Sequence, residues 1–190
     1  MRTEDLQTLP DDLPAPVDDG AAAHLPGAAL PDVALPATDG GEVRLDTLPG
    51  RTVVFAYPRT GRPGEESLGG DAHWNAIPGA RGCTPQNCAI RDAYEEFGAL
   101  GVRVLGLSTQ TTEDQREAAT RLGLPYPLLS DAGLRLAEAL GLPTFEVAGV
   151  TLLKRLTLLL RDGRVEDVVY PVFPPDAAAE QALARLRSGA

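Results

Sequence analysis

Short apolar runs alternate with segments of helical periodicity along most of this chain, and this alternation constrains the fold more than any other feature. Residues 51–58, 102–109 and 126–130 have the composition of buried strands. Helical signals follow each run: apolar positions from the region of Cys83 to Gly98 or Gly101, a Thr112/Gln115 capping box with a stop at Gly123, and Asp131 as the cap of a helix through Leu140. The order predicts an α/β fold with a central mixed β-sheet flanked by helices.

Two hairpins complete the predicted domain. Apolar and polar residues alternate on both sides of Asp39-Gly40-Gly41, which predicts an N-terminal β-hairpin, and residues 157–172 predict a second one. Asp176 is placed to cap a last helix. Residues 1–26 are acidic, rich in proline and without periodicity, so we expect an extended N-terminal arm there and one domain over residues 27–190.

Charge and composition exclude several classes of partner. The chain has 27 acidic and 17 basic residues, a formal charge of -10, which disfavours nucleic acids and anionic membranes. The first residues lack the apolar core of a signal peptide, and no stretch reaches the roughly 20 apolar residues of a membrane span. We therefore expect a cytoplasmic protein, and since no surface pattern indicates a dimer patch, a monomer.

Cys83 and Cys88 are the only cysteines of the chain. In a reducing cytosol, a close pair is more often catalytic or metal-binding than structural. However, the spacing is neither that of a CxxC motif nor that of a zinc site, and a single cysteine at a helix start is usually a small buried apolar residue. The spacing alone leaves a redox pair and a coincidence equally open.

Helix geometry gives the two thiols different environments. Cys83 is predicted at the helix N-terminus, on the face of Ile90, Tyr94 and Phe97, where the helix dipole favours a thiolate. A thiolate attacks peroxide to form a sulfenic acid, with which a second thiol can condense. In an ideal helix the two Cα atoms lie about 8.6 Å apart. A disulfide requires less than about 7 Å, so the first turn would have to unwind.

The run GCTPQNCAIRD resembles the active-site segment of peroxiredoxins of the PrxQ, or bacterioferritin comigratory protein, group. In that group Gly-Cys-Thr-x-x-x-Cys precedes a helix that continues Phe-Arg-Asp, and the matching residues here are Gly82, Cys83, Thr84, Cys88, Arg91 and Asp92. The resemblance begins near Pro31 and implies a thioredoxin-like fold. It also implies that Cys83 is the peroxidatic cysteine and Cys88 the resolving one, that hydroperoxides are the substrates, that thioredoxin or a similar dithiol is the reductant, and that there is no cofactor.

A second segment, KRLTLLLRDGRV, is similar to the family's Arg-x-Thr-Phe-Leu-Ile-Asp-x-x-Gly segment. The match places Arg155 at the arginine that family members hold beside the peroxidatic sulfur. A guanidinium there would stabilise the thiolate and hold a peroxide oxygen through its fixed fork of donors. Lys154 is expected on the opposite face of the strand.

The chain departs from the family pattern before Cys83. Ala80 stands where the family usually has threonine and Arg81 where proline is common, so the hydroxyl that would meet the peroxide must come from Thr84, from Thr60 or from neither. A long loop between residues 59 and 82 leads into the cysteines, and its insertion at 62–77 exceeds the family pattern.

The remaining candidates yield no further site. His24 and His73 lack partners at ligand spacing, so no metal site is predicted, and Trp74 is expected to pack the insertion onto the domain. Two alternatives to a thiol peroxidase stay open: a thioredoxin-fold thiol-disulfide oxidoreductase, which would lack its usual CxxC, and a redox sensor that turns over slowly.

Overall fold

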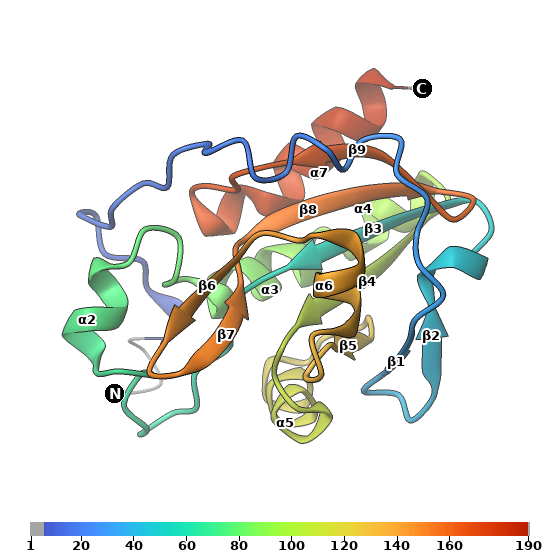
Figure 1. The fold of residues 1–190 in the computed structure, drawn as a ribbon. Coiled ribbons are helices and arrows are strands. Elements are labelled where there is room, and N and C mark those ends of the chain that lie inside the picture. The colour runs from blue at the N-terminus through green and yellow to red at the C-terminus, as the bar shows by residue number, and fades with distance from the viewer. Residues whose placement is uncertain (1–5, 190) are drawn as a thin grey trace.

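A five-stranded sheet with the strand order β5-β4-β3-β8-β9 forms the centre of the fold. The computed structural model describes residues 6–189 (Figure 1). The strands of this sheet are β3 (Arg51–Ala56), β4 (Val102–Ser108), β5 (Leu128–Ser130), β8 (Leu156–Arg161) and β9 (Arg164–Val169). The first three run parallel, and β8 and β9 are antiparallel to their neighbours, so the predicted mixed sheet is confirmed.

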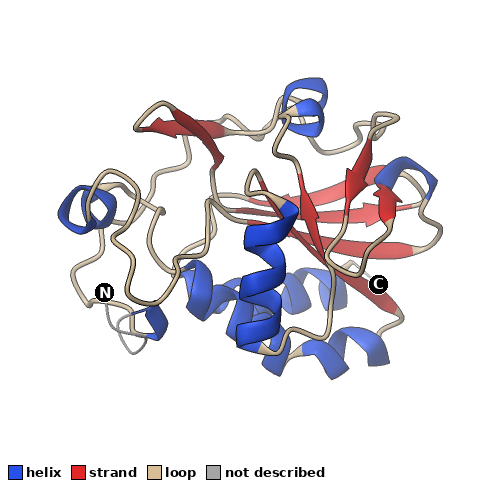
Figure 2. Cartoon of the chain, turned by 90° about the horizontal axis from the view of Figure 1, so that it is seen from below, coloured by secondary structure: helices blue, strands red, loops and turns tan. Residues whose placement is uncertain are grey.

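Helices cover both faces of the sheet because alternate residues of β3 point to opposite sides. Val53 and Phe55 pack into one core cluster and Val54 and Ala56 into the other. The first cluster is shared with α3 (Cys83–Asp92), α4 (Tyr94–Ala99) and α7 (Ala178–Ser188), and the second with α6 (Arg135–Leu140); α5 (Thr112–Leu122) contacts β5. Figure 2 shows helices gathered along one side of the strands. Within residues 6–189, no helix is long and apolar enough to cross a membrane.

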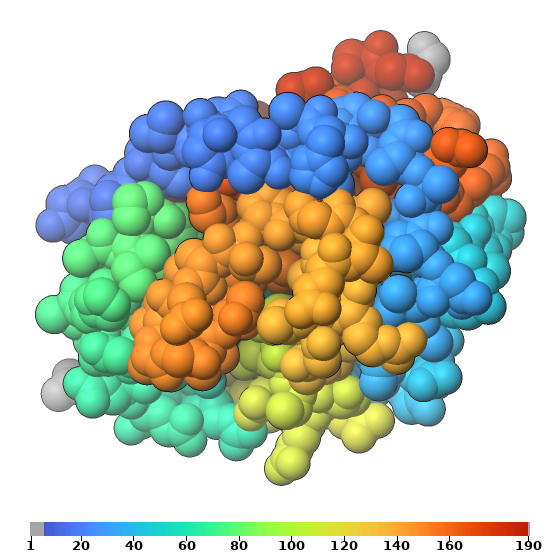
Figure 3. Space-filling view, viewed as in Figure 1, coloured from blue at the N-terminus to red at the C-terminus, as the bar shows by residue number. Residues whose placement is uncertain are grey.

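The predicted N-terminal hairpin is present as β1 (Ala34–Pro36) and β2 (Glu42–Arg44), which pair antiparallel. Before it, the arm follows the surface of the domain (Figure 3). Ala22 and Leu25 of the arm are buried in the second core cluster. Residues 1–5 lie outside the described part, and the boundary at residue 26 stays a prediction.

One hairpin and one α-helix were not predicted. The hairpin β6 (Thr144–Val147) and β7 (Val150–Leu153) forms a separate two-stranded sheet, and α2 (Asp71–Ala76) lies inside the segment expected to be a loop. Trp74 of α2 is buried against Val147 and Leu152 of the hairpin. The insertion is therefore packed onto the domain through its tryptophan, as expected.

Helix ends differ from the predictions in three places. The long helix after Cys83 is two helices, because the backbone at Ala93 (φ -94°, ψ 3°) leaves the helical range. The cap of α5 is Thr111 rather than Thr112, since its side chain accepts from the backbone N–H of Asp114. Asp176 caps nothing: it lies within a 3-10 turn, η2 (Pro175–Ala177), and α7 begins without a side-chain cap.

Candidate active site

Cys83 is the first residue of α3 and its side chain is buried, with 3% of the residue exposed. Gly82 precedes it with a φ of 105°, a conformation that glycine tolerates far better than other residues. Any Cβ at Gly82 would also lie 2.5 Å from Cγ of Pro175. The sequence Gly-Cys thus allows the chain to turn into α3 while it is pressed against η2.

Arg155 lies between β7 and β8 and is as buried as Cys83. Its Nη2 is 3.4 Å from Sγ of Cys83. Its Nη1 donates to Oε1 of Gln86, one turn further along α3. The structure thus brings together two residues that are 72 positions apart in the chain.

Backbone carbonyls of the loop before Cys83 fix the same guanidinium. Nη2 of Arg155 lies 3.2 Å from the carbonyl oxygen of Gly79, 3.3 Å from that of Ala80 and 3.0 Å from that of Arg81. The carbonyl of Ala80 also accepts from Sγ of Cys83 at 3.7 Å. Because several acceptors orient the guanidinium, its charge is held beside the sulfur without further reorganisation.

Two buried donors of this cluster have no hydrogen-bond partner within residues 6–189. They are Nε of Arg155 and Nε2 of Gln86. These N–H groups can donate to an oxygen atom that comes within hydrogen-bond reach of them. The guanidinium beside the sulfur can also stabilise negative charge on it.

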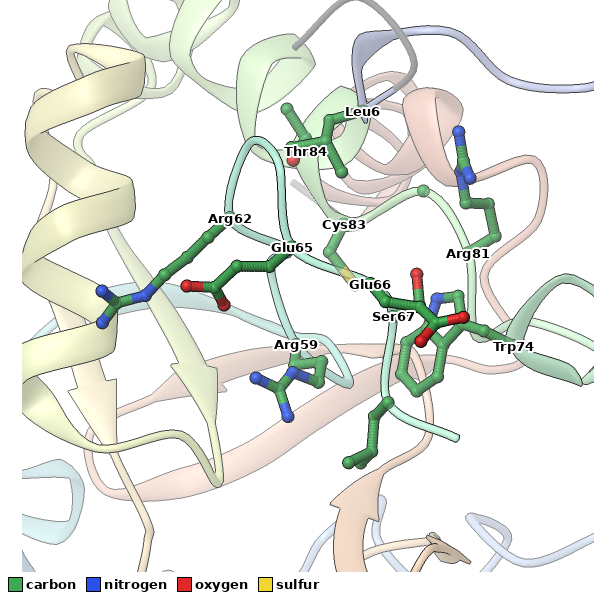
Figure 4. A pocket seen from close by; sticks show the side chains of 13 residues that line it. Leu6, Arg59, Arg62, Glu65, Glu66, Ser67, Trp74, Arg81, Cys83 and Thr84 are labelled. Carbon is green, nitrogen blue, oxygen red and sulfur yellow. The ribbon is translucent and has the colours of Figure 1, made fainter. Parts of the chain in front are cut away.

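A small pocket of about 40 Å³ opens at Cys83 (Figure 4). Its lining comes from the arm, from the segment after β3, from the insertion and from the cysteine loop: Leu6, Arg59, Gly61, Arg62, Glu65, Glu66, Ser67, Leu68, Trp74, Arg81, Gly82, Cys83 and Thr84. In Figure 4 the sulfur of Cys83 points toward the middle of these residues, whereas Arg62 extends away from it. Arg62 forms an ion pair with Asp114 of α5 at 2.5 Å.

The two candidate hydroxyls have different positions. Thr84 is buried and lines the pocket next to Cys83. Thr60 does not line it, and its Oγ1 and backbone N–H both donate to Oε1 of Gln110. Ala80, at the position of the family threonine, is buried and contributes only its backbone carbonyl. Of the two threonines, Thr84 alone is in the pocket.

Cys88 lies on the other side of α3, half-buried, and both cysteines are free thiols. Burial raises the pKa of the Cys88 thiol; the charge of Asp92 also raises this pKa, while Arg91 opposes the shift. Cys88 thus keeps its proton over a wider pH range than an exposed cysteine would. Since both residues belong to one continuous helix, α3 holds the two thiols apart.

A buried polar network that the sequence did not reveal clamps the first turn of α3. Nδ2 of Asn87 donates to the carbonyl of Cys83 at 2.9 Å. The hydroxyl of Tyr126 lies 2.9 Å from Oδ1 and 3.0 Å from the carbonyl oxygen of Asn87. The ring of Tyr126 stacks on Tyr94, whose centroid is 6.2 Å away, so Tyr94 packs here and is partly exposed rather than facing the core as predicted.

The histidines lie away from this site. Nε2 of His24 is 3.0 Å from the carbonyl oxygen of Leu140, and His73 belongs to α2. Among residues 6–189 there is no group of three or more His, Cys, Asp or Glu side chains that could hold a metal ion.

Comparisons with known proteins find relatives over most of the chain. The Redoxin family model matches residues 25–183. The chain is 30% identical over 163 residues to "Peroxiredoxin Q, chloroplastic" of Oryza sativa subsp. japonica, a match that covers 85% of this chain and 66% of the rice protein. The match thus leaves a third of that relative outside the comparison.

Solved structures share the fold. The crystal structure of Peroxidoxin BcpB from Mycobacterium tuberculosis superposes with a TM-score of 0.68 at 31% identity, covering 87% of this chain and 98% of the mycobacterial one. Peroxiredoxin Q of Xanthomonas campestris has a TM-score of 0.64 at 24% identity, covering 84% and 94% of the two chains, which supports the fold alone.

Proposed function

Because the chain belongs to the peroxiredoxin family, among the members that resemble peroxiredoxin Q and the bacterioferritin comigratory protein, we propose that Cys83 reduces hydroperoxides and that Cys88 resolves the product. The family consists of thiol-dependent peroxidases. The observation that carries the assignment is the distance of 3.4 Å between Nη2 of Arg155 and Sγ of Cys83, at the N-terminus of α3 and at the edge of a pocket.

In the first step, the Cys83 thiolate attacks the terminal oxygen of a hydroperoxide. The O–O bond breaks, an S–O bond forms, and the remaining oxygen leaves as an alcohol, or as water from hydrogen peroxide, after it takes up a proton. Arg155 stabilises the negative charge first on sulfur and then on the leaving oxygen. Of the two candidate threonines, Thr84 lines the pocket, and its hydroxyl can donate to the peroxide.

In the second step, Cys88 attacks the sulfenic acid sulfur of Cys83. The S–O bond breaks, a disulfide forms and water leaves, so the peroxide has been reduced by two thiols. A reductant with a dithiol, thioredoxin or a similar protein, then restores both thiols by exchange. We propose that the protein carries out this cycle as a monomer and that it does so in the cytoplasm.

Formation of the disulfide is expected to melt the first turn of α3. An intact helix separates the cysteines, and closing the bond must break the contacts of Asn87 with Cys83 and Tyr126. The backbone amides of residues 87–93 should therefore lose protection from hydrogen exchange upon oxidation, while those of β3 and β4 stay protected. Oxidised Cys88→Ser, which cannot close the bond, is the matched control and should keep its protection. An intramolecular disulfide confirmed by mass spectrometry with unchanged exchange over 87–93 would refute this unwinding.

The function itself is tested by peroxide consumption in the presence of thioredoxin, thioredoxin reductase and NADPH. We expect many equivalents of peroxide to be consumed per protein, with NADPH oxidised in proportion. A redox sensor would stop after about one equivalent, because it is not turned over, and a thiol-disulfide oxidoreductase would reduce insulin instead. Either result would contradict the proposed peroxidase.

A further inference from the structure

The N-terminal arm supplies one wall of the Cys83 pocket. Leu6 is buried, with 8% of the residue exposed, and it lines the pocket together with Trp74 and Thr84, which lie far from it in the sequence. Figure 4 shows Leu6 beside Thr84, close to the bend of the chain that carries Cys83. The arm therefore meets the site at the residue next to the reactive thiol.

Two glycines of the pocket lining, Gly61 and Gly82, lie against the arm. A Cβ at Gly61 would lie 3.0 Å from Cδ2 of Leu6, and one at Gly82 would lie 2.9 Å from Cδ2 of Leu9. Side chains at these two positions would push Leu6 and Leu9 away. The close fit shows that the two leucines occupy defined positions on the site.

Polar contacts fasten the arm between these leucines and further along the chain. Nη2 of Arg81, in the cysteine loop, donates to the carbonyl of Thr8 at 3.3 Å. Further along, Asp19 forms an ion pair with Lys154 at 2.6 Å and accepts from the hydroxyl of Tyr170 at 2.7 Å. Because Lys154 directly precedes Arg155, the arm is attached next to the catalytic guanidinium as well as at the pocket.

The space that remains is small. The space at Cys83 that admits water-sized groups is about 40 Å³. The two oxygens of hydrogen peroxide fit into it. An aromatic hydroperoxide such as cumene hydroperoxide also carries a phenyl ring and two methyl groups, and this bulk has to lie against the lining to which Leu6 and Trp74 contribute.

We propose that Leu6 is a specificity-determining residue, which closes the pocket so that it accepts hydrogen peroxide and other small hydroperoxides and excludes bulky ones. The proposal rests on the proposed peroxidase function and narrows its substrate class. A smaller side chain at position 6 enlarges the pocket without removing a charge or a hydrogen-bond donor from it.

The test measures single-turnover oxidation of Cys83 by hydrogen peroxide and by cumene hydroperoxide. Trp74, the only tryptophan of the chain, lines the pocket and serves as the fluorescence reporter. Losing a few methyl groups from a pocket wall changes selectivity by about tenfold or more, so Leu6→Ala should speed the oxidation of Cys83 by cumene hydroperoxide by that factor. The ratio of the cumene hydroperoxide rate to the hydrogen peroxide rate should rise accordingly. Val17→Ala, on the same arm but 82% exposed, is the matched control and should change neither rate.

A second variant gives the opposite change and guards against a folding defect. Leu6→Phe narrows the pocket and should slow even the oxidation by hydrogen peroxide. The proposal is overturned if the wild type reacts equally fast with both peroxides, or if Leu6→Ala leaves the ratio of the two rates unchanged. Failure of both peroxides to oxidise wild-type Cys83 would instead reject the peroxidase function, and with it the proposed role of Leu6 in specificity.

Discussion

Cys83→Ser is expected to abolish peroxide reduction, lowering the rate by on the order of 10³-fold or more, because a serine hydroxyl at neutral pH is neither ionised nor able to carry the transferred oxygen. Cys88→Ser should leave the first oxidation of Cys83 fast and block only the turnover that depends on thioredoxin. The difference arises because only Cys83 contacts Arg155 and the pocket, whereas Cys88 is half-buried on the far side of α3.

The two variants are controls for one another, since each removes one thiol from the same helix. Stopped-flow oxidation separates the first step from steady-state turnover, and mass spectrometry identifies the product. Without its resolving partner, oxidised Cys83 of Cys88→Ser should progress to sulfinic acid when peroxide is in excess. Equal single-turnover rates in the wild type and Cys83→Ser would rule out Cys83 as the peroxidatic residue. Exclusively intermolecular bridges in the wild type would rule out Cys88 as the resolving one.

The central strands of the sheet were predictable because they are buried on both faces and therefore appear in the sequence as continuous apolar runs. β3 and β4 are examples, and their segments were located to within two residues. The hairpin β6–β7 was missed because it lies outside the main sheet and is partly exposed, so it has no such run. Helix α2 has six residues and starts at Gly70 without a side-chain cap, and thus carries no periodicity or capping signal. Tertiary packing of Trp74 stabilises it instead.

The family and the thioredoxin-like α/β fold, expected from the resemblance, are confirmed by the family match and the structural neighbours. Contacts between distant residues could not be foreseen in the same way. Arg155 and Gln86 are 69 positions apart, and Tyr126 and Asn87 are 39 apart. Gln86 and Asn87 look like ordinary polar helix residues until the fold buries them completely. The arm shows why composition misleads: a segment without periodicity still buries Leu6 against the pocket.

Arg155→Met should slow the oxidation of Cys83 by about 10²–10³-fold, the loss typical of removing one charged donor from a site where negative charge develops. Methionine retains much of the volume but removes the charge 3.4 Å from the sulfur. It also leaves the carbonyls of the loop before Cys83 without their shared donor, so the thermal midpoint should fall as well. Arg161→Met is the matched control, because Arg161 is an exposed arginine at the end of β8 whose partner is Glu166.

The charge at position 155 separates a direct role of Arg155 from a structural one. The guanidinium lies 3.4 Å from the sulfur, where negative charge is stabilised during the reaction. Arg155→Lys keeps this charge but loses the planar fork that joins Gln86 to Cys83. We therefore expect the single-turnover rate of Arg155→Lys to lie between those of the wild type and Arg155→Met. If Arg155→Lys and Arg155→Met are equally slow, or if Arg155→Met is as fast as Arg161→Met, Arg155 has no electrostatic role in the reaction, and its contacts serve only to hold the loop before α3.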